Sequence, residues 1–174
     1  FVVGAGTVGG ALLRALAEQR PAILADHDIE AVLVGVARSD RVSFDAQGLT
    51  DWDHNARSGP IDDDTLDTLA RLPLPVLIDC TAADGMEALY SRALARGIHV
   101  VVANKKALTL PQARRNALLQ TARARHRAFR YETTVGAEGP MAGSGGLEEF
   151  RYETTVGAAL PVISTLHDLI RSGD

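Results

Sequence analysis

Phe1-Val2-Val3-Gly4-Ala5-Gly6-Thr7-Val8-Gly9 is the stretch of sequence that decides the fold. Its apolar start predicts a buried strand, and leucines at positions 12, 13 and 16 predict a helix over residues 11–19 that Pro21 ends. A second apolar strand is expected over residues 31–37. A strand, a glycine turn, a helix and a strand in this order form one βαβ unit.

Strands and helices continue to alternate after residues 41–60, a segment without a clear period that is expected to be a loop with at most a short strand. The further expected elements are a helix over 62–72, a strand over 76–81, a helix over 85–96, a strand over 99–103 and a helix from 109 to about 125. This alternation predicts an α/β fold, a Rossmann-type doubly wound parallel sheet with helices on both faces.

The composition restricts the class of molecule. With 174 residues, of which 46% are hydrophobic, the chain can form one substantial core. The net charge of -4 and the dispersed Lys and Arg residues argue against nucleic acid and favour a small-molecule partner. A single cysteine excludes an internal disulfide framework, and no apolar run approaches the roughly 20 residues of a membrane span. We therefore expect a cytoplasmic protein without a membrane segment.

The glycines of the opening turn follow the pattern G-x-G-x-x-G, which binds dinucleotides when it joins a strand to a helix. Gly4 permits the tight turn, Gly6 lets the backbone approach a pyrophosphate, and Gly9 lets the helix pack closely on the strand. Thr7 and Val8 lie in the first turn of the helix, whose positive end attracts phosphate. These five residues are expected to bind the cofactor, although such glycines also serve packing alone.

The choice of cofactor should depend on the end of the second strand, where an NAD enzyme usually has an acidic residue. This chain has Arg38 there, followed by Ser39. A guanidinium group forms paired, charge-assisted hydrogen bonds with a phosphate, so NADP(H) is favoured and NAD(H) stays possible. In the alternative interpretation, Arg38 is a solvated loop residue and Asp40 fills the acidic role.

Polar residues also follow two later strands at the edge where open α/β folds bind ligands. Asn104 and Lys105 follow the strand over 99–103, and Thr81 ends the strand before it. Lys105 could hold a carbonyl or carboxylate group, or be a surface charge, and Thr81 could contact the cofactor or cap a helix. Cys80 lies in an apolar strand and is expected to be an inert packing residue. The five histidines show no metal-ligand spacing, so zinc is not expected.

A duplicated segment marks the end of the chain. Residues 129–137 recur as residues 150–158, with a Gly- and Ser-rich stretch between the copies. A single repeat is too little for a solenoid, and a tandem duplication explains it better than a functional design. We divide the chain into a nucleotide-binding domain over 1–128, the duplicated segment over 129–158 and a further region over 159–174, and the sequence does not decide which copy joins the sheet.

Three motifs together resemble the homoserine dehydrogenase family, closest to the type fused to aspartate kinase. They are Leu77-Ile78-Asp79-Cys80-Thr81-Ala82, Ala103-Asn104-Lys105-Lys106 and Tyr152-Glu153-Thr154-Thr155-Val156-Gly157-Ala158-Ala159-Leu160-Pro161. The resemblance covers nearly the whole chain. It implies an oxidoreductase that interconverts aspartate 4-semialdehyde and homoserine with NAD(P), in threonine and methionine biosynthesis.

The resemblance also implies roles for particular residues. The Gly4 to Gly9 turn would hold the pyrophosphate, and Arg38 would face the adenosine phosphate. Thr81, Asn104 and Lys105 would lie near the nicotinamide, with Lys105 as the candidate catalytic residue. A monovalent cation such as sodium would bind at the segment of Glu153, Val156, Ala158 and Leu160, largely through backbone oxygens.

The family's substrate domain would lie beyond Asp174, so the resemblance implies a cofactor-binding half that is inactive alone and a homo-oligomer only in the longer protein. Two alternatives stay open. The chain could be a nucleotide-binding fragment or decayed copy without catalysis, or another NADP-dependent oxidoreductase of amino-acid biosynthesis. An aspartate-semialdehyde dehydrogenase would need a catalytic cysteine other than Cys80, the only cysteine present.

Overall fold

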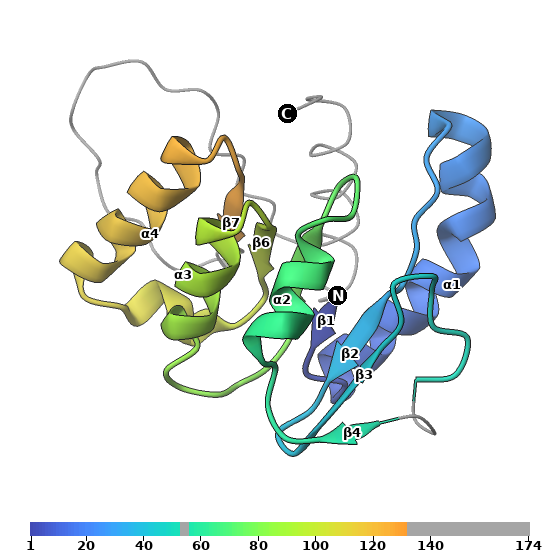
Figure 1. Ribbon diagram of the computed structural model, residues 1–174, viewed down its shortest axis with the longest axis horizontal. Helices are drawn as coiled ribbons and strands as arrows, with labels where there is room; N and C mark the ends of the chain where they lie inside the picture. Colours follow the sequence, from blue (N-terminus) through green and yellow to red (C-terminus); the bar gives the residue numbers. More distant parts are fainter. Residues whose placement is uncertain (53–55, 132–174) are drawn as a thin grey trace.

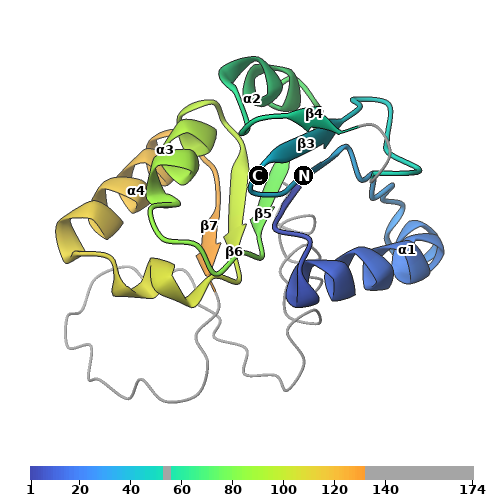
Figure 2. The same cartoon turned by 90° about the horizontal axis from the view of Figure 1, so that it is seen from below.

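The structure is a computed structural model that describes residues 1–52 and 56–131. Its seven-stranded sheet has the strand order β4-β3-β2-β1-β5-β6-β7 (Figures 1 and 2). The strands are β1 (Val2–Val3), β2 (Gly35–Ala37), β3 (Arg41–Phe44), β4 (Arg57–Ser58), β5 (Val76–Asp79), β6 (His99–Val102) and β7 (Phe129–Tyr131). The helices are α1 (Thr7–His27), α2 (Asp63–Leu69), α3 (Glu87–Ala95) and α4 (Gln112–Ala124), with a 3-10 helix η1 (Lys105–Thr109).

Five neighbouring strands of the sheet, in the order β2-β1-β5-β6-β7, pair in parallel. This arrangement confirms the predicted Rossmann-type sheet. Helices cover both faces, with α1 on one face and α2, α3 and α4 on the other (Figures 1 and 2). Two apolar clusters fill the layers between the sheet and its helices. Leu12 and Leu13 of α1 belong to one cluster, and Tyr90 and Leu94 of α3 belong to the other.

The far edge of the sheet is antiparallel, because β3 pairs antiparallel with both β2 and β4. The sequence predicted at most a short strand here. Strands of four and two residues contain too few alternations to give a periodic signal. Along β3 the exposed Arg41 is followed by the buried Val42 and Ser43, so a simple alternation is absent as well.

Helix α1 continues through Pro21 to His27, so the prediction that Pro21 ends the helix was wrong. The residues on both sides of Pro21 are exposed, so a carbonyl group that loses its helical partner can bind water. The turn after Pro21 places Ile23 in the protein interior, where it is 5% exposed. Asp28, in the left-handed region with φ 56°, ends the helix.

Strand β7 comes from the first copy of the duplicated segment. Phe129, Arg130 and Tyr131 pair in parallel with Val100, Val101 and Val102 of β6. The second copy, over 150–158, lies outside the described residues, as does the region over 159–174. The predicted domain division thus stays a prediction beyond residue 131.

The strand order reverses between β1 and β5, because the chain winds outward from β1 in both directions. In open α/β sheets, a crevice forms at such a point beyond the carboxyl ends of the strands. Gly4 follows β1, Arg38 follows β2, and Asn104 closely follows β6. The fold therefore brings the predicted site residues to one edge of the sheet, which we call the carboxyl edge.

Candidate cofactor-binding site

The turn between β1 and α1 requires glycine at two positions. Gly4 has φ +88°, a conformation that L side chains rarely adopt, and its N–H donates to the Ala37 carbonyl at 2.8 Å. A Cβ atom on Gly9 would lie only 1.8 Å from the carbonyl oxygen of Gly4. The missing side chain at Gly9 therefore allows α1 to pack directly against the turn.

The space beside Gly6 is open, since a Cβ atom there would meet no atom within 4 Å. Gly6 is the N-cap of α1, no side chain caps this end of the helix, and its first turn contains no acidic residue. The first N–H groups of a helix lack partners within the helix, and together with the helix dipole they attract an anion. Gly6, Thr7 and Val8 therefore fit the pyrophosphate of a dinucleotide.

A cavity of about 390 Å³ opens beside this turn, between the end of β2 and the loop that follows β5. Its polar lining includes Arg38, Ser39 and Thr81, and its apolar lining includes Met86 and Leu89. An apolar wall with a few polar groups is typical of a small-molecule site. The cavity thus presents polar groups from the ends of both β2 and β5, on the two sides of Gly4.

Arg38 lies where the sequence predicted it, directly after β2. Its guanidinium carbon lies 4.8 Å from the centroid of the Trp52 ring, so the cation rests on an aromatic face. Asp40, the alternative ribose ligand, pairs instead with Arg41 at 3.5 Å and has a side chain that is 71% exposed. The geometry favours Arg38 as the residue that meets the cofactor's ribose.

Thr81 and Asn104 meet at a buried carboxylate that the sequence analysis did not assign to the site. Asp79, at the end of β5, is 0% exposed. Its Oδ1 atom accepts a hydrogen bond from the Thr81 N–H at 2.8 Å, and its Oδ2 atom accepts from the Tyr90 hydroxyl and from Asn104 Nδ2, the latter at 3.3 Å. The signal was present in the sequence as a single carboxylate within the apolar run of β5.

Tyr90 of α3 reaches this carboxylate through the protein interior. Burial, followed by the charge of Asp79, raises the pKa of the Tyr90 hydroxyl far above its ordinary value. The hydroxyl therefore stays protonated and donates to Asp79. No spacing in the sequence links Tyr90 with Asp79, since Tyr90 looks like an ordinary core residue of an amphipathic helix.

The two lysines after Asn104 lie in η1 and have exposed side chains. The Lys106 ammonium pairs with Asp84 at 2.7 Å. Lys105 is the first residue of η1, directly beside Asn104. Of the two, Lys105 is the one that directly follows the buried Asn104, and its place near the nicotinamide stays a prediction.

Other predictions made from the sequence concern metals and the membrane. The predicted cation segment of Glu153, Val156, Ala158 and Leu160 lies outside the described residues. Within residues 1–52 and 56–131, no three His, Cys, Asp or Glu side chains are placed to hold a metal ion. Over the same residues, no helix has the length and apolar character needed to cross a membrane. Cys80 is buried, as expected for a packing residue.

Sequence comparisons place the chain in a family. The profile described as homoserine dehydrogenase, NAD binding domain, matches residues 4–132. A bifunctional aspartokinase/homoserine dehydrogenase of Haemophilus influenzae is 36% identical over 181 aligned positions, covering 100% of this chain and 20% of that protein. A homoserine dehydrogenase of Schizosaccharomyces pombe is 28% identical over 99% of this chain and 43% of its own length. The chain thus spans less than half of these relatives.

Solved structures share the fold. A homoserine dehydrogenase of S. aureus has a TM-score of 0.56 at 19% identity, over 75% of this chain and 32% of that chain. A hyperthermophilic archaeal homoserine dehydrogenase in complex with NADPH has a TM-score of 0.57 at 18% identity, over 75% of this chain and 42% of its own. With the profile match over most of the chain, the identification follows. The chain belongs to the homoserine dehydrogenase family, an oxidoreductase family, and carries its NAD-binding domain.

Proposed function

We propose that this chain is the cofactor-binding half of an NADP(H)-dependent homoserine dehydrogenase, which interconverts aspartate 4-semialdehyde and homoserine. One observation carries the cofactor assignment. The open, uncapped start of α1 lies at the point where the strand order reverses, and the Arg38 cavity adjoins it. The family supports the reaction, because its named members are homoserine dehydrogenases.

The cofactor would lie across the carboxyl edge of the sheet. Gly6, Thr7 and Val8 would hold the pyrophosphate through backbone N–H groups. The adenosine half would extend towards Arg38, and the nicotinamide half towards Thr81 and Asn104 on the other side of β1. When bound, the nicotinamide ring supplies or accepts the hydride of the reaction.

NADP(H) is the cofactor we propose, ahead of NAD(H). The Arg38 guanidinium can form two parallel hydrogen bonds with a 2'-phosphate, and the Trp52 ring beneath it limits the orientations of its plane. The archaeal relative with the same fold was solved with NADPH. Lys105, beside Asn104, is proposed as the catalytic charge that faces the substrate.

Further parts of the proposal rest on the family resemblance. They are a sodium-like cation at Glu153, Val156, Ala158 and Leu160, a small-molecule substrate, a homo-oligomer in the longer protein and a cytoplasmic location. Hydride transfer requires cofactor and substrate in one fixed orientation. We therefore propose that residues 1–131 bind the cofactor without catalysing the reaction by themselves.

Titration calorimetry of the purified chain with NADPH and with NADH tests the cofactor assignment. We expect saturable binding that favours NADPH, and Arg38→Ala should weaken NADPH about tenfold, the equivalent of one lost charge-assisted hydrogen bond, while NADH binding is unchanged. Arg41→Ala is the control, because Arg41 is the next arginine along the chain, at the start of β3, but pairs with Asp40. Equal losses for both cofactors would contradict the role of Arg38.

A fusion tests the reaction. The region that follows the matched segment in the Haemophilus influenzae relative would be joined to this chain, and NADPH formation from homoserine and NADP would be measured. Activity that Lys105→Ala abolishes is the expected result. A folded fusion that binds NADPH but forms no product would favour the alternative of a non-catalytic nucleotide-binding chain.

A further inference from the structure

The buried Asp79 carboxylate joins three separate elements. Its donors are the Thr81 N–H in the loop after β5, the Tyr90 hydroxyl of α3 and the Asn104 amide after β6. A buried charge is costly unless it is hydrogen-bonded, so an apolar residue would be expected in such a place if packing were the only demand. Asp79 is hydrogen-bonded to Thr81 and Asn104, two predicted cofactor residues, which indicates a role in cofactor binding.

The network fixes which way the Asn104 amide points. The two Nδ2 hydrogens serve three acceptors, so one is shared: the acceptors are the Asp79 carboxylate, Thr81 Oγ1 at 3.2 Å and the Ala83 carbonyl at 2.9 Å. Oδ1 accepts from the Lys106 N–H at 3.1 Å. A rotation of the amide by 180° would oppose acceptor to acceptor and donor to donor. The backbone at the start of η1, which includes Lys105, is therefore fastened to the Asp79 carboxylate.

The same network determines what Thr81 can offer a ligand. Its hydroxyl oxygen accepts from Asn104 Nδ2 and from the Ala83 N–H at 3.3 Å. A hydroxyl group has two lone pairs and one hydrogen, so these two donors leave the hydrogen as the group available to a ligand. Thr81 is half-buried and lines the cavity beside Gly4. It is thus prepared to donate to an acceptor on the cofactor.

We propose that Asp79 and Tyr90 are positioning residues, which orient the Thr81 hydroxyl and the Asn104–Lys105 backbone towards the nicotinamide half of the cofactor. This inference rests on the proposed binding of NADP(H). It separates two parts of the site: Arg38 acts on the adenosine half, and the Asp79–Tyr90 pair acts on the nicotinamide half. The two parts should therefore respond to different fragments of the cofactor.

The test compares NADPH with 2',5'-ADP, which contains the adenosine half and lacks the nicotinamide. Tyr90→Phe removes the hydroxyl but keeps the ring, whose centroid lies 5.8 Å from that of Phe129. We expect Tyr90→Phe to weaken NADPH about fivefold to tenfold, within the range of one hydrogen bond, and to leave 2',5'-ADP within twofold. A purely structural role would weaken both ligands alike. Either equal losses or an unchanged affinity for NADPH would overturn the inference.

Two further variants keep the test decisive. Asp79→Asn preserves the shape of the side chain but removes an acceptor. It should weaken NADPH and spare 2',5'-ADP, as expected for Tyr90→Phe, and it replaces that variant in the test if Tyr90→Phe folds poorly. Thr65→Val is the matched control, because its buried hydroxyl also donates to a carboxylate, Asp62 at 2.6 Å, at the start of α2. It should change neither affinity. If the unaltered chain bound neither NADPH nor 2',5'-ADP, that result would instead reject the proposed cofactor function itself.

Discussion

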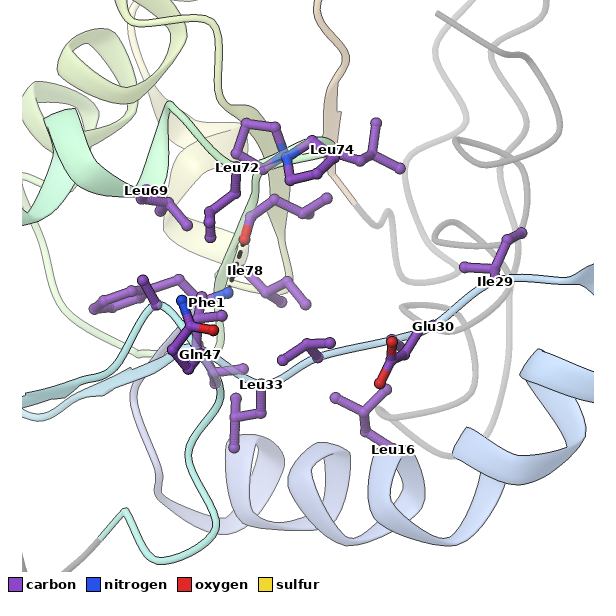
Figure 3. A pocket seen from close by; sticks show the side chains of 18 of the residues that line it. Phe1, Leu16, Ile29, Glu30, Leu33, Gln47, Leu69, Leu72, Leu74 and Ile78 are labelled. Carbon is purple, nitrogen blue, oxygen red and sulfur yellow. Dashed lines mark hydrogen bonds between the residues drawn. The ribbon is translucent and has the colours of Figure 1, made fainter.

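The two edges of the sheet carry cavities of similar size and different chemistry. The cavity at the carboxyl edge, about 390 Å³, adjoins Arg38, Thr81 and the uncapped start of α1. At the opposite edge, where β1, β2 and β5 begin and which we call the amino edge, a cavity of about 450 Å³ is lined mainly by apolar side chains such as Leu16, Leu69 and Leu72 (Figure 3). Its side-chain polar groups are those of Glu30 and Gln47, and Glu30 pairs with Arg20.

The volume of a cavity therefore does not identify the cofactor site. A dinucleotide carries at least two phosphates, and burial of these charges requires donors and positive ends of dipoles. The larger cavity has apolar walls, whereas the smaller one lies beside helix N–H groups and a guanidinium. Folding alone explains the apolar edge, because the elements that meet there have to bury their hydrophobic surfaces.

The largest effect is expected at the carboxyl edge. Gly9→Ala places a methyl carbon 1.8 Å from the Gly4 carbonyl oxygen, so the turn and α1 must separate. We expect a loss of about 3 kcal/mol in stability and no measurable NADPH binding. In the control Gly10→Ala, the nearest atom to the new methyl group would be Arg14 Nη1 at 3.7 Å, an ordinary van der Waals contact, so stability and binding should persist. Thermal unfolding and calorimetry distinguish them, and normal binding by Gly9→Ala would refute the close packing.

The smallest effect on binding is expected for Leu16→Ala. Leu16 is half-buried on α1 and lines the apolar cavity (Figure 3). Its truncation should cost about 1 to 2 kcal/mol of stability, less than a fully buried leucine, because the site is partly open to solvent. NADPH affinity should stay within twofold in the same calorimetric assay. A loss greater than fivefold would mean that the amino edge takes part in cofactor binding.

The sequence predicted the glycine turn and the strands β1, β5 and β6 because long apolar runs and glycine spacing are local signals. It overestimated β2, which begins at Gly35 and not at residue 31. Residues 31–34 are apolar because they line the amino-edge cavity, and apolar character alone does not distinguish this from sheet pairing. Whether residues 31–34 pair in the sheet depends on where they lie relative to the neighbouring strands.

The candidate site shows the same limit. Thr81, Asn104 and Arg38 could be named because each follows a strand whose end the sequence marks. Tyr90 could not, because its contact with Asp79 joins the interior face of α3 to the end of β5. Trp52 reaches Arg38 across an irregular loop that has no period to read. Contacts that depend on tertiary packing are invisible to local patterns.

The most direct test of the cofactor site is hydrogen exchange of the chain with and without NADPH, resolved by peptide. We predict that NADPH slows exchange in residues 4–10, where the N–H groups of the turn and of α1 would bind the pyrophosphate, and around residues 38–40. Residues 29–34 at the amino edge should exchange at unchanged rates. Protection confined to the amino edge, or saturable binding without protection in residues 4–10, would contradict the placement of the cofactor at the carboxyl edge.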